Sequence, residues 1–380
     1  MQTAGTAASD ETLDVSLVRG DFLHRLQRKV GLIPPDSLGI TRRALFWSMF
    51  TWLPIAVWTL YMDGTLPPLA VHAMFLVGLP SFAIADGIAH DYTESLWLYF
   101  TRSGLVPEGE VPRFRAVLAG IIKLRDSTLP WICILGFVVV ILVLSDVTPT
   151  AHAIIWNVGD AEAFGAVWFL YVGRPIYLTV LFGWLWRLLL VILLFHRISK
   201  LDLAIVPAHP DHMGGLGFLE YFPKIFAPVV LALGVVIAGS MAHNVIYYEV
   251  SVESLEIAMV AFVILALAVF LSPQFVFMWK LMKAKKQALL DYGALINRYG
   301  ILLHDQWIEG RGMKNQELIE AFDVADTVML YKAVKDMRPV LLGKTSVAPI
   351  LLAAVVPMLL ALTSEAPIRE LLSKLIKAVI

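Results

Sequence analysis

The chain has 380 residues, of which 58% are hydrophobic and 16% are charged. Soluble domains carry about 45–50% apolar and about 25% charged residues, so both fractions favour a membrane protein. The net charge of −1 argues against a nucleic-acid partner, which requires a basic surface. The single cysteine, Cys133, excludes an internal disulfide and any zinc site with two or more cysteines.

Residues 1–43 are predicted to form a cytosolic N-terminal tail. They lack the basic start and apolar core of a secretory signal peptide. An amphipathic segment, Phe22 to Val30, comes shortly before the first apolar run. We therefore expect a short, poorly ordered tail that leads through this segment into the membrane.

Seven apolar runs are long enough to cross a membrane. A hydrocarbon core of about 30 Å requires roughly 20 apolar residues as helix, because every backbone polar group must be hydrogen-bonded within its own segment. The runs are 44–62, 67–89, 130–147, 174–196, 226–248, 255–279 and 345–363. The predicted fold is an all-α integral membrane protein of about seven transmembrane helices, with six of them in residues 44–279.

Basic residues alternate between successive connections, and this alternation predicts the orientation. The connections that hold Lys or Arg are 90–129, 197–225 and 280–344, and those that hold none are 63–66, 148–173 and 249–254. Because basic connections stay on the cytoplasmic side, the N-terminus is expected in the cytosol.

Residues 280–344 are predicted to form a cytosolic helical hairpin. Its first helix continues the sixth span, and GRGMKNQ (310–316) forms a turn before the second helix. Two helices of this length are too small for an independent domain, so they are expected to pack on other cytosolic loops or on a second subunit. The apolar stripe of the first helix is Leu289, Tyr292, Ile296, Tyr299 and Leu303.

The last segment, 345–380, combines a seventh membrane helix with an amphipathic C-terminal helix. Pro349 and Pro357 interrupt the seventh run, which either spans the membrane or re-enters it. In PIRELLSKLIKAVI the apolar residues recur at helical spacing, which is typical of a helix in the membrane interface.

Several strings in the second half of the chain resemble a widespread group of bacterial inner-membrane proteins. They are WLWRLLL (184–190), RISKLDL (197–203), HPDHMGGLGFL (209–219), DYGALINRYG (291–300) and VKDMRPVLLGKTS (334–346). The most specific is the His-Pro-Asp-x-x-Gly-Gly-Leu-x-Phe-Leu string, and the similarity runs from about residue 165 to the C-terminus. The resemblance implies a multi-pass protein of the bacterial inner (plasma) membrane and implies no chemistry.

Arg187 is the strongest single candidate for a functional residue. It lies about ten residues before Arg197 and thirteen after Arg174, which predicts a position near the middle of the membrane. An arginine there costs from ~3 to more than 10 kcal/mol on a lone helix, so it must be paired and face protein or water. Asp86 is the expected partner, at a depth difference of roughly 7 Å. The pair is either a structural lock, part of an ion or proton path, or a substrate counter-ion.

A second group of side chains could hold a divalent metal. Asp86, His90 and Glu94 are spaced four residues apart and share one face of a continuous helix. The HPDH string is expected on the same side of the membrane. Carboxylate and imidazole are common metal ligands, although no spacing matches a specific template. The alternative is that helix ends simply collect polar residues. The candidate ligands are Asp86, His90, Glu94, His209, Asp211 and His212.

The glycines after this string form a third candidate site. Gly214, Gly215 and Gly217 could adopt positive φ and expose N–H groups that cradle an anion. With His209 and Asp211 they would form the cytosolic mouth of a pathway. The alternative is a tight interfacial turn before the fifth span.

Three functions follow from these patterns. The first is movement of an ion or small solute through an oligomeric helical assembly, with Arg187 and Asp86 along the path. The second is a membrane-embedded metal-binding protein or metal-dependent enzyme at the cytosolic interface. The third is a membrane scaffold whose hairpin recruits a soluble cytosolic partner. The expected partners are the lipid bilayer and further copies of the chain, and the only cofactor considered is a divalent metal.

Overall fold

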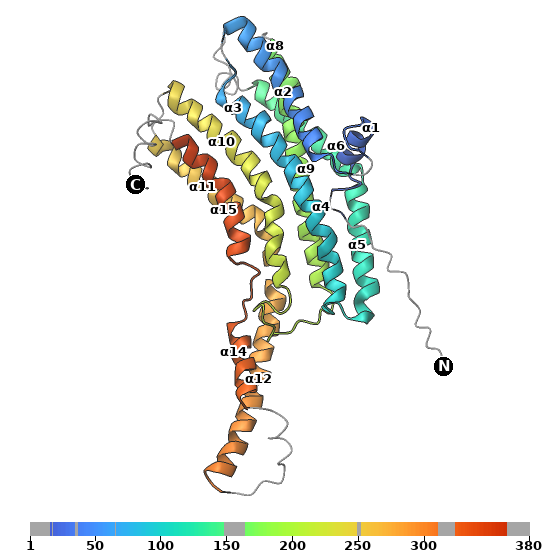
Figure 1. Cartoon of the computed structure of the whole chain (residues 1–380), viewed down its shortest axis with the longest axis vertical. Coiled ribbons are helices and arrows are strands. Elements are labelled where there is room, and N and C mark those ends of the chain that lie inside the picture. Colours follow the sequence, from blue (N-terminus) through green and yellow to red (C-terminus); the bar gives the residue numbers. More distant parts are fainter. Residues whose placement is uncertain are drawn as a thin grey trace, which may run out of the picture.

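Figure 1 shows the computed structural model, which describes residues 16, 18–34, 37–64, 66–147, 164–248, 252–310 and 324–362. Within these ranges every regular element is a helix and no strand is present. The helices stand side by side in an elongated bundle, and one pair of helices extends from its end (Figure 1). The predicted all-α class is confirmed.

Five helices of the described chain are long and apolar enough to cross a membrane, or up to seven if each of two bent pairs is one span. The unbent runs are α2 (Ile40–Asp63), α3–η1–α4 (Leu69–His72, Ala73–Gly78 and Leu79–Arg102), α8–η3–α9 (Phe164–Trp168, Phe169–Gly173 and Arg174–Ser199), η4–α10 (Gly217–Phe226 and Ala227–Tyr248) and α15 (Lys344–Leu362). This range includes the predicted count of about seven.

The two bent pairs lie at the third and sixth predicted spans. The helical segment that ends with α5 (Val111–Asp126), after the short η2 (Glu108–Glu110), meets α6 (Leu129–Val147) at 41°. The second pair joins α11 (Val252–Phe270), through η5 (Ser272–Phe275), to α12 (Met278–Trp307) at 49°. Pro273 stands in η5, where its ring and missing N–H prevent a regular α-turn.

Prolines also explain the two π-helical segments. Segment η1 ends two residues before Pro80, and η3 ends two residues before Pro175. A proline removes one backbone hydrogen bond and crowds the carbonyl four residues earlier, so a wider turn accommodates it. The two segments pack together, since a Cβ on Gly173 would lie 2.5 Å from the Phe75 ring.

The seventh predicted span is one continuous helix. Helix α15 runs through both Pro349 and Pro357 and packs along α10. The contact is close at Gly234 of α10, where an added Cβ would lie 3.2 Å from Pro357 and 3.3 Å from the Ala353 carbonyl. Small residues permit such close packing of membrane helices.

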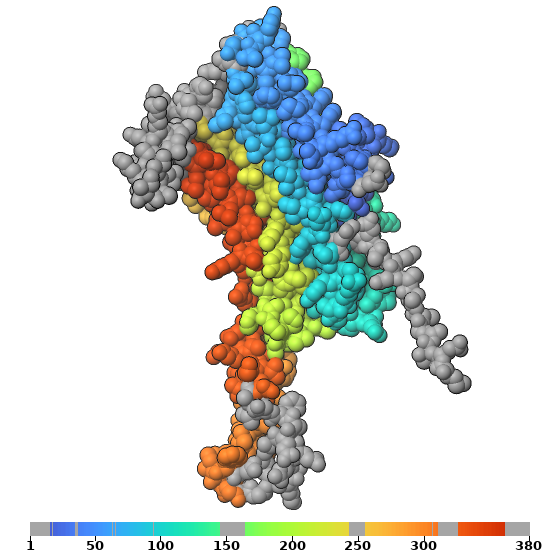
Figure 2. Space-filling model, in the orientation of Figure 1, coloured from blue at the N-terminus to red at the C-terminus, as the bar shows by residue number. Residues whose placement is uncertain are grey.

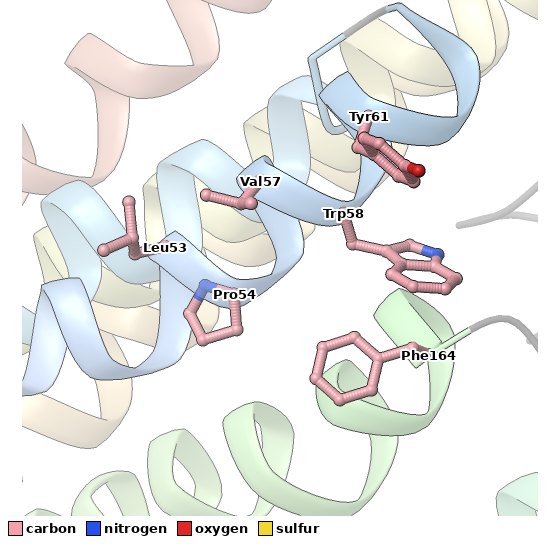
Figure 3. A pocket seen from close by; sticks show the side chains of 6 residues that line it. All are labelled: Leu53, Pro54, Val57, Trp58, Tyr61 and Phe164. Atoms are coloured by element: carbon pink, nitrogen blue, oxygen red, sulfur yellow. The ribbon is translucent and has the colours of Figure 1, made fainter.

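Large apolar side chains cover the outer faces of α2, α6, α11 and α15. Examples are Leu129, Ile257 and Leu360, which are 67%, 79% and 67% exposed. In water so large an apolar surface would be unfavourable, whereas acyl chains cover it at no such cost. Between α2 and α8 this face holds a groove of about 350 Å³ without a charged side chain, lined by Leu53, Pro54, Val57, Trp58, Tyr61 and Phe164 (Figure 3).

The hairpin predicted over 280–344 consists of α12 and α14 (Val324–Asp336), which we call the α12–α14 arm. Helix α12 is 30 residues long and extends about 45 Å, and in Figure 2 the arm stands clear of the bundle. Tyr299, in the predicted apolar stripe, is buried in the hairpin, and the other four stripe residues are half-buried. The predicted turn at 310–316 lies almost wholly outside the described residues.

The N-terminal segment is not a loose tail over its described part. Residues Phe22–Lys29 form helix α1, which matches the predicted amphipathic segment. Its Phe22 ring lies 5.7 Å from that of Trp131 at the start of α6. Helix α2 already begins at Ile40, inside the predicted tail of residues 1–43. The predicted C-terminal interfacial helix falls on residues 363–380, which lie outside the described chain.

Candidate functional site

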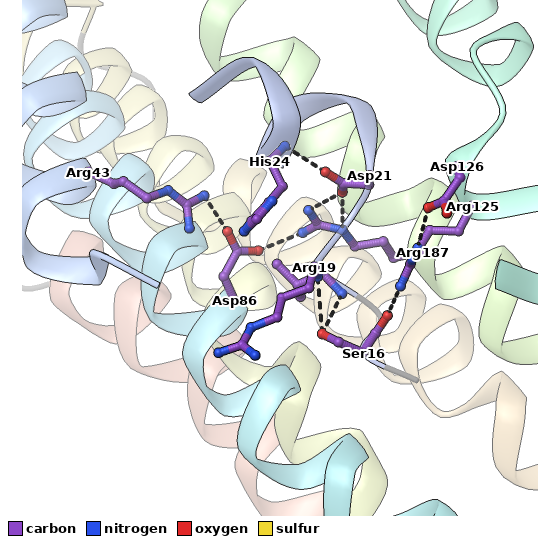
Figure 4. A network of polar contacts seen from close by, with 10 residues as sticks. Ser16, Arg19, Asp21, His24, Arg43, Asp86, Arg125, Asp126 and Arg187 are labelled. Atoms are coloured by element: carbon purple, nitrogen blue, oxygen red, sulfur yellow. Dashed lines mark hydrogen bonds and ion pairs between the residues drawn. The ribbon is translucent and has the colours of Figure 1, made fainter. Parts of the chain in front are cut away.

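Arg187 of α9 binds two carboxylates from different parts of the chain (Figure 4). Its Nη1 lies 2.6 Å from Oδ1 of Asp86, and its Nη2 lies 2.6 Å from Oδ2 of Asp21. Its Nε donates a further hydrogen bond of 3.2 Å to Asp21, and its Cζ lies 4.6 Å from the centre of the Trp184 ring. The pairing predicted between Arg187 and Asp86 is therefore present, and Asp21 is a second partner.

Arg43 extends the network on the other side of Asp86. Its Nη2 lies 2.5 Å from the second carboxylate oxygen of Asp86. Arg43 stands in the first turn of α2, and Asp86 lies in the first third of α4. The four side chains Asp21, Arg187, Asp86 and Arg43, which we call the Arg187 network, join the N-terminal segment to three helices.

Local structure fixes the position of Asp21. It is the N-cap of α1, and its Oδ1 accepts a 2.7 Å hydrogen bond from the backbone N–H of His24. Because Oδ1 caps the helix, Oδ2 is left to pair with Arg187. The single carboxylate of Asp21 therefore both caps α1 and anchors it to the bundle. Nearby, Arg125 donates to the Ser16 carbonyl and pairs with Asp126 at 2.8 Å, which holds the preceding residues.

The network is buried and electrically balanced. Its members are 2–5% exposed, and two arginines face two carboxylates. Desolvation of such charges costs several kcal/mol per ion, and only close, well-formed pairs offset it. Within the described chain, Nε and Nη1 of Arg43 are buried without a hydrogen-bond partner. These contacts favour the structural-lock interpretation of Arg187 over an open ion path.

The network also lies nearer one end of the bundle than its sequence position indicated. The helix that carries Arg187 begins at Phe164, ten residues before Arg174, and ends at Ser199, so Arg187 is well past its midpoint. Its partners Asp21 and Arg43 belong to the segment predicted to be cytosolic. The prediction measured depth from Arg174 and Arg197, and the longer helix shifts Arg187 toward the Ser199 end.

The predicted metal ligands do not converge in the part of the chain that can be described. No group of three or more His, Cys, Asp and Glu side chains there could hold a metal ion. Asp86 is occupied by two arginines, which compete with a cation. His90 lies on α4 one turn beyond Asp86, and the side chain of Glu94 lies outside the described atoms. His209 instead pairs with Asp211, with 2.9 Å between Nδ1 and Oδ1.

The glycine loop, residues 209–217, does bind an anionic group, and that group is the Asp211 side chain of the same loop. The Asp211 carboxylate accepts hydrogen bonds of 2.7, 3.2 and 2.8 Å from the backbone N–H groups of Met213, Gly215 and Gly217. Burial raises the pKa of this carboxyl, but these three hydrogen bonds outweigh that effect and hold its pKa below the ordinary value. The predicted cradle at Gly214, Gly215 and Gly217 is thus filled from within, which favours the tight-turn alternative.

This loop connects the bundle to the arm. The backbone N–H of Arg338, just after α14, donates a 2.6 Å hydrogen bond to the carbonyl of His212. Gly214 has φ +69°, and an added Cβ there would lie 2.6 Å from Ile205 and 3.1 Å from Met337. The HPDHMGG string therefore forms a tight junction at the base of the arm, and His212 also has positive φ, at 55°.

Asp21 and Arg43 are the network residues that sequence analysis missed. Asp21 precedes an amphipathic segment with no apolar run around it, so its local signal was only that of a helix cap. Its burial depends on packing between segments more than 160 residues apart. Comparison of the chain with family models, with curated proteins and with solved structures finds no match, so its functional assignment rests on the geometry described here.

Proposed function

We propose that this chain is a multi-pass membrane scaffold whose α12–α14 arm joins it to a second copy of itself. The observation that carries the proposal is the apolar outer face of the arm. Leu290, Ile301 and Ile308 are 62%, 53% and 73% exposed. They recur at intervals of eleven and seven residues, which place them on one side of a helix.

That face is turned away from α14. The buried Tyr299 lies on nearly the opposite side of α12 from Ile301, because two residues turn a helix by about 200°. Helix α14 also has apolar side chains exposed on its surface, with Met329 at 68%. Asn297 and His304 lie between the exposed apolar side chains of α12 on the same face of that helix, so the proposed contact combines apolar and polar groups.

A second copy suits this face better than an unrelated chain. Copies in one membrane share their orientation, so their arms lie at the same height and present identical surfaces, as a two-fold interface requires. Residues 287–310 and 324–336 hold three basic and five acidic side chains, so two arms would repel each other only weakly. Paired arms would form a four-helix assembly with a buried centre.

The location of the chain belongs to the same proposal. The distribution of Lys and Arg supports an orientation with the N-terminus and the arm in the cytosol. The bacterial inner membrane is the location that the resemblance of the HPDHMGGLGFL string implies. In Figure 1 the arm leaves the same end of the bundle as the loop between α9 and η4, which also carries basic residues. Two basic connections at one end of the bundle are in keeping with this orientation.

Movement of an ion or small solute through the oligomer stays a prediction from the sequence. A path would have to run between copies or require the Arg187 network to open, because both carboxylates that face Arg187 are bound to it. Ion flux into proteoliposomes that contain the wild-type chain, compared with empty vesicles, tests it.

Cysteine crosslinking in native membranes tests the scaffold proposal. In a Cys133→Ser background, Ile301→Cys places one thiol on the outer face of the arm. The matched control is Arg113→Cys, whose native side chain on α5 is 73% exposed. Helix α5 stands apart from the arm (Figure 1). We expect a crosslinked dimer of the chain with Ile301→Cys and only background with Arg113→Cys.

Two outcomes contradict the proposal. Equal crosslinking at both positions would show random collision, and no crosslinking at either would leave the arm unpaired. A crosslink from Ile301→Cys to a different protein would replace the second copy with a soluble partner. That result would restore the recruiting scaffold predicted from the sequence.

A further inference from the structure

A cavity of about 370 Å³ lies between the N-terminal segment and α5, and basic side chains line it. Arg19, Arg25 and Arg28 come from the N-terminal segment, and Arg125 comes from the last turn of α5. Ser37 adds a hydroxyl and His24 an imidazole ring. None of the described lining residues carries a carboxylate.

The charge in this cavity differs from that of the adjacent Arg187 network because it is not balanced. Arg125 pairs with Asp126 at 2.8 Å, so one of the four guanidinium groups is neutralised. Arg25 donates to the backbone carbonyl of Asp126 at 3.0 Å, which leaves its own charge uncompensated. Arg19 and Arg28 form no ion pair with any side chain in the described chain. Among the described lining residues the cavity therefore has an excess of about three positive charges, from Arg19, Arg25 and Arg28.

The backbone around the cavity and the Arg125 side chain are held in place, while the side chains of Arg25 and Arg28 are exposed. Asp21, which anchors α1 to Arg187, stands directly before the residues that line one wall. Gly20 has φ +94°, and an added Cβ there would lie 2.7 Å from Nη2 of Arg125. Only a glycine lets the backbone pass this guanidinium so closely. The backbone that carries Arg19, Arg25 and Arg28 is therefore held against α5, so less backbone freedom is lost when the cavity binds an anion.

We propose that this cavity binds a phosphate group, and that its source is the headgroup of an anionic phospholipid. The planar guanidinium fork matches the oxygens of a phosphate in paired hydrogen bonds, and several forks around one cavity favour a multiply oxygenated anion over chloride. Helix α1 also exposes Leu26 and Val30, at 46% and 65%, beside its basic residues. That combination is typical of a helix lying at the boundary between headgroups and acyl chains.

Lipid binding by matched double variants tests this proposal. Arg19→Gln with Arg28→Gln removes two unpaired charges of the cavity without touching the Arg187 network. Arg113→Gln with Arg115→Gln removes two charges from exposed positions on α5. Native mass spectrometry of protein in neutral detergent, titrated with phosphatidylglycerol or phosphatidylcholine, reports the bound lipid. Thermal unfolding with inorganic phosphate, in the same detergent without lipid, reports the free anion.

We expect saturable binding of phosphatidylglycerol in preference to phosphatidylcholine. The cavity variant should weaken it at least tenfold, and the α5 variant should change it less than twofold. Binding of inorganic phosphate alone, lost in the cavity variant, would support the phosphate site but overturn the lipid headgroup as its source. Equal affinities in the two double variants, or no binding of either probe, would overturn the site itself. If the double variant unfolds without ligand, the exposed Arg28→Gln alone replaces it with the same criteria.

Discussion

The Arg187 network and the α12–α14 arm place side chains in opposite kinds of surroundings. In the network, charged groups that prefer water are 2–5% exposed, and carboxylates and guanidinium groups are paired at 2.5–2.6 Å. In the arm, apolar groups that avoid water are more than half exposed at Leu290, Ile301 and Ile308. Charged residues are usually exposed and apolar residues usually buried, so both regions depart from the usual pattern. Such departures indicate which parts of a molecule have a special role.

The two departures have different consequences. Both carboxylates of the network are already paired with guanidinium groups of the chain, so the network holds the fold together. The exposed apolar side chains of the arm are not covered within the described chain, and the proposed function covers them with a second copy. Mutations in the network should therefore change stability, and mutations in the arm should change association.

The largest effect is expected for Arg187→Met. This change leaves Asp21 without a cation and Asp86 with Arg43 alone. Removal of one partner from a buried ion network lowers the free energy of unfolding by about 3–5 kcal/mol. Unfolding of purified protein in mixed micelles, followed by tryptophan fluorescence, measures it. Arg113→Met is the control, because that side chain is 73% exposed and pairs with Glu110 within its own local segment. A loss below about 1 kcal/mol would show that the network contributes little to stability.

Replacement of Asp21 separates its two roles. Asp21→Asn keeps a good helix cap but removes the charge that faces Arg187, for an expected loss of about 1.5–3 kcal/mol. Asp21→Ala removes the cap as well and should cost about 1 kcal/mol more. Trypsin cleavage at Arg25 and Arg28 measures release of α1. If Asp21→Asn is cleaved no faster than wild type, the ion pair does not hold the N-terminal segment.

Some residues of the network and of the arm could be predicted from the sequence, and others could not. Arg187 required a partner, and Asp86 could be inferred because both lie in apolar runs at similar depth. The stripe that includes Tyr299 predicted the hairpin, because helical periodicity is a local property. Asp21 and Arg43 could not be inferred, since their burial depends on how the N-terminal segment folds back on α9 and α4. The prediction for the glycine loop was wrong for a different reason. Its N–H groups were expected to bind a ligand, but they donate hydrogen bonds to Asp211, four residues before Gly215.

The junction between bundle and arm should weaken in acid. Because the pKa of Asp211 is lowered in the folded chain, its contribution to stability is present above the ordinary value of 3.8 and is lost as the pH falls through the lowered pKa. Asp211→Asn keeps the shape but loses the charge, for an expected cost of about 1–2 kcal/mol at pH 7. Unfolding measured from pH 7 to pH 3 should show this difference shrinking below pH 4. A difference that stays constant would mean that the carboxylate charge does not stabilise the loop.

The smallest effect on stability is expected for Ile301→Ser in the arm. Its side chain is 53% exposed and faces away from α14, so the change should alter the unfolding free energy by less than about 0.5 kcal/mol. The same change should lower the dimer fraction, measured by light scattering in detergent, because it removes an apolar group from the centre of the proposed interface. Tyr299→Ser, inside the hairpin, should instead destabilise the arm, since that side chain is 7% exposed. If Ile301→Ser destabilised the chain as much as Tyr299→Ser, the outer face would be part of the fold, and the distinction between a paired network and an uncovered arm would fail.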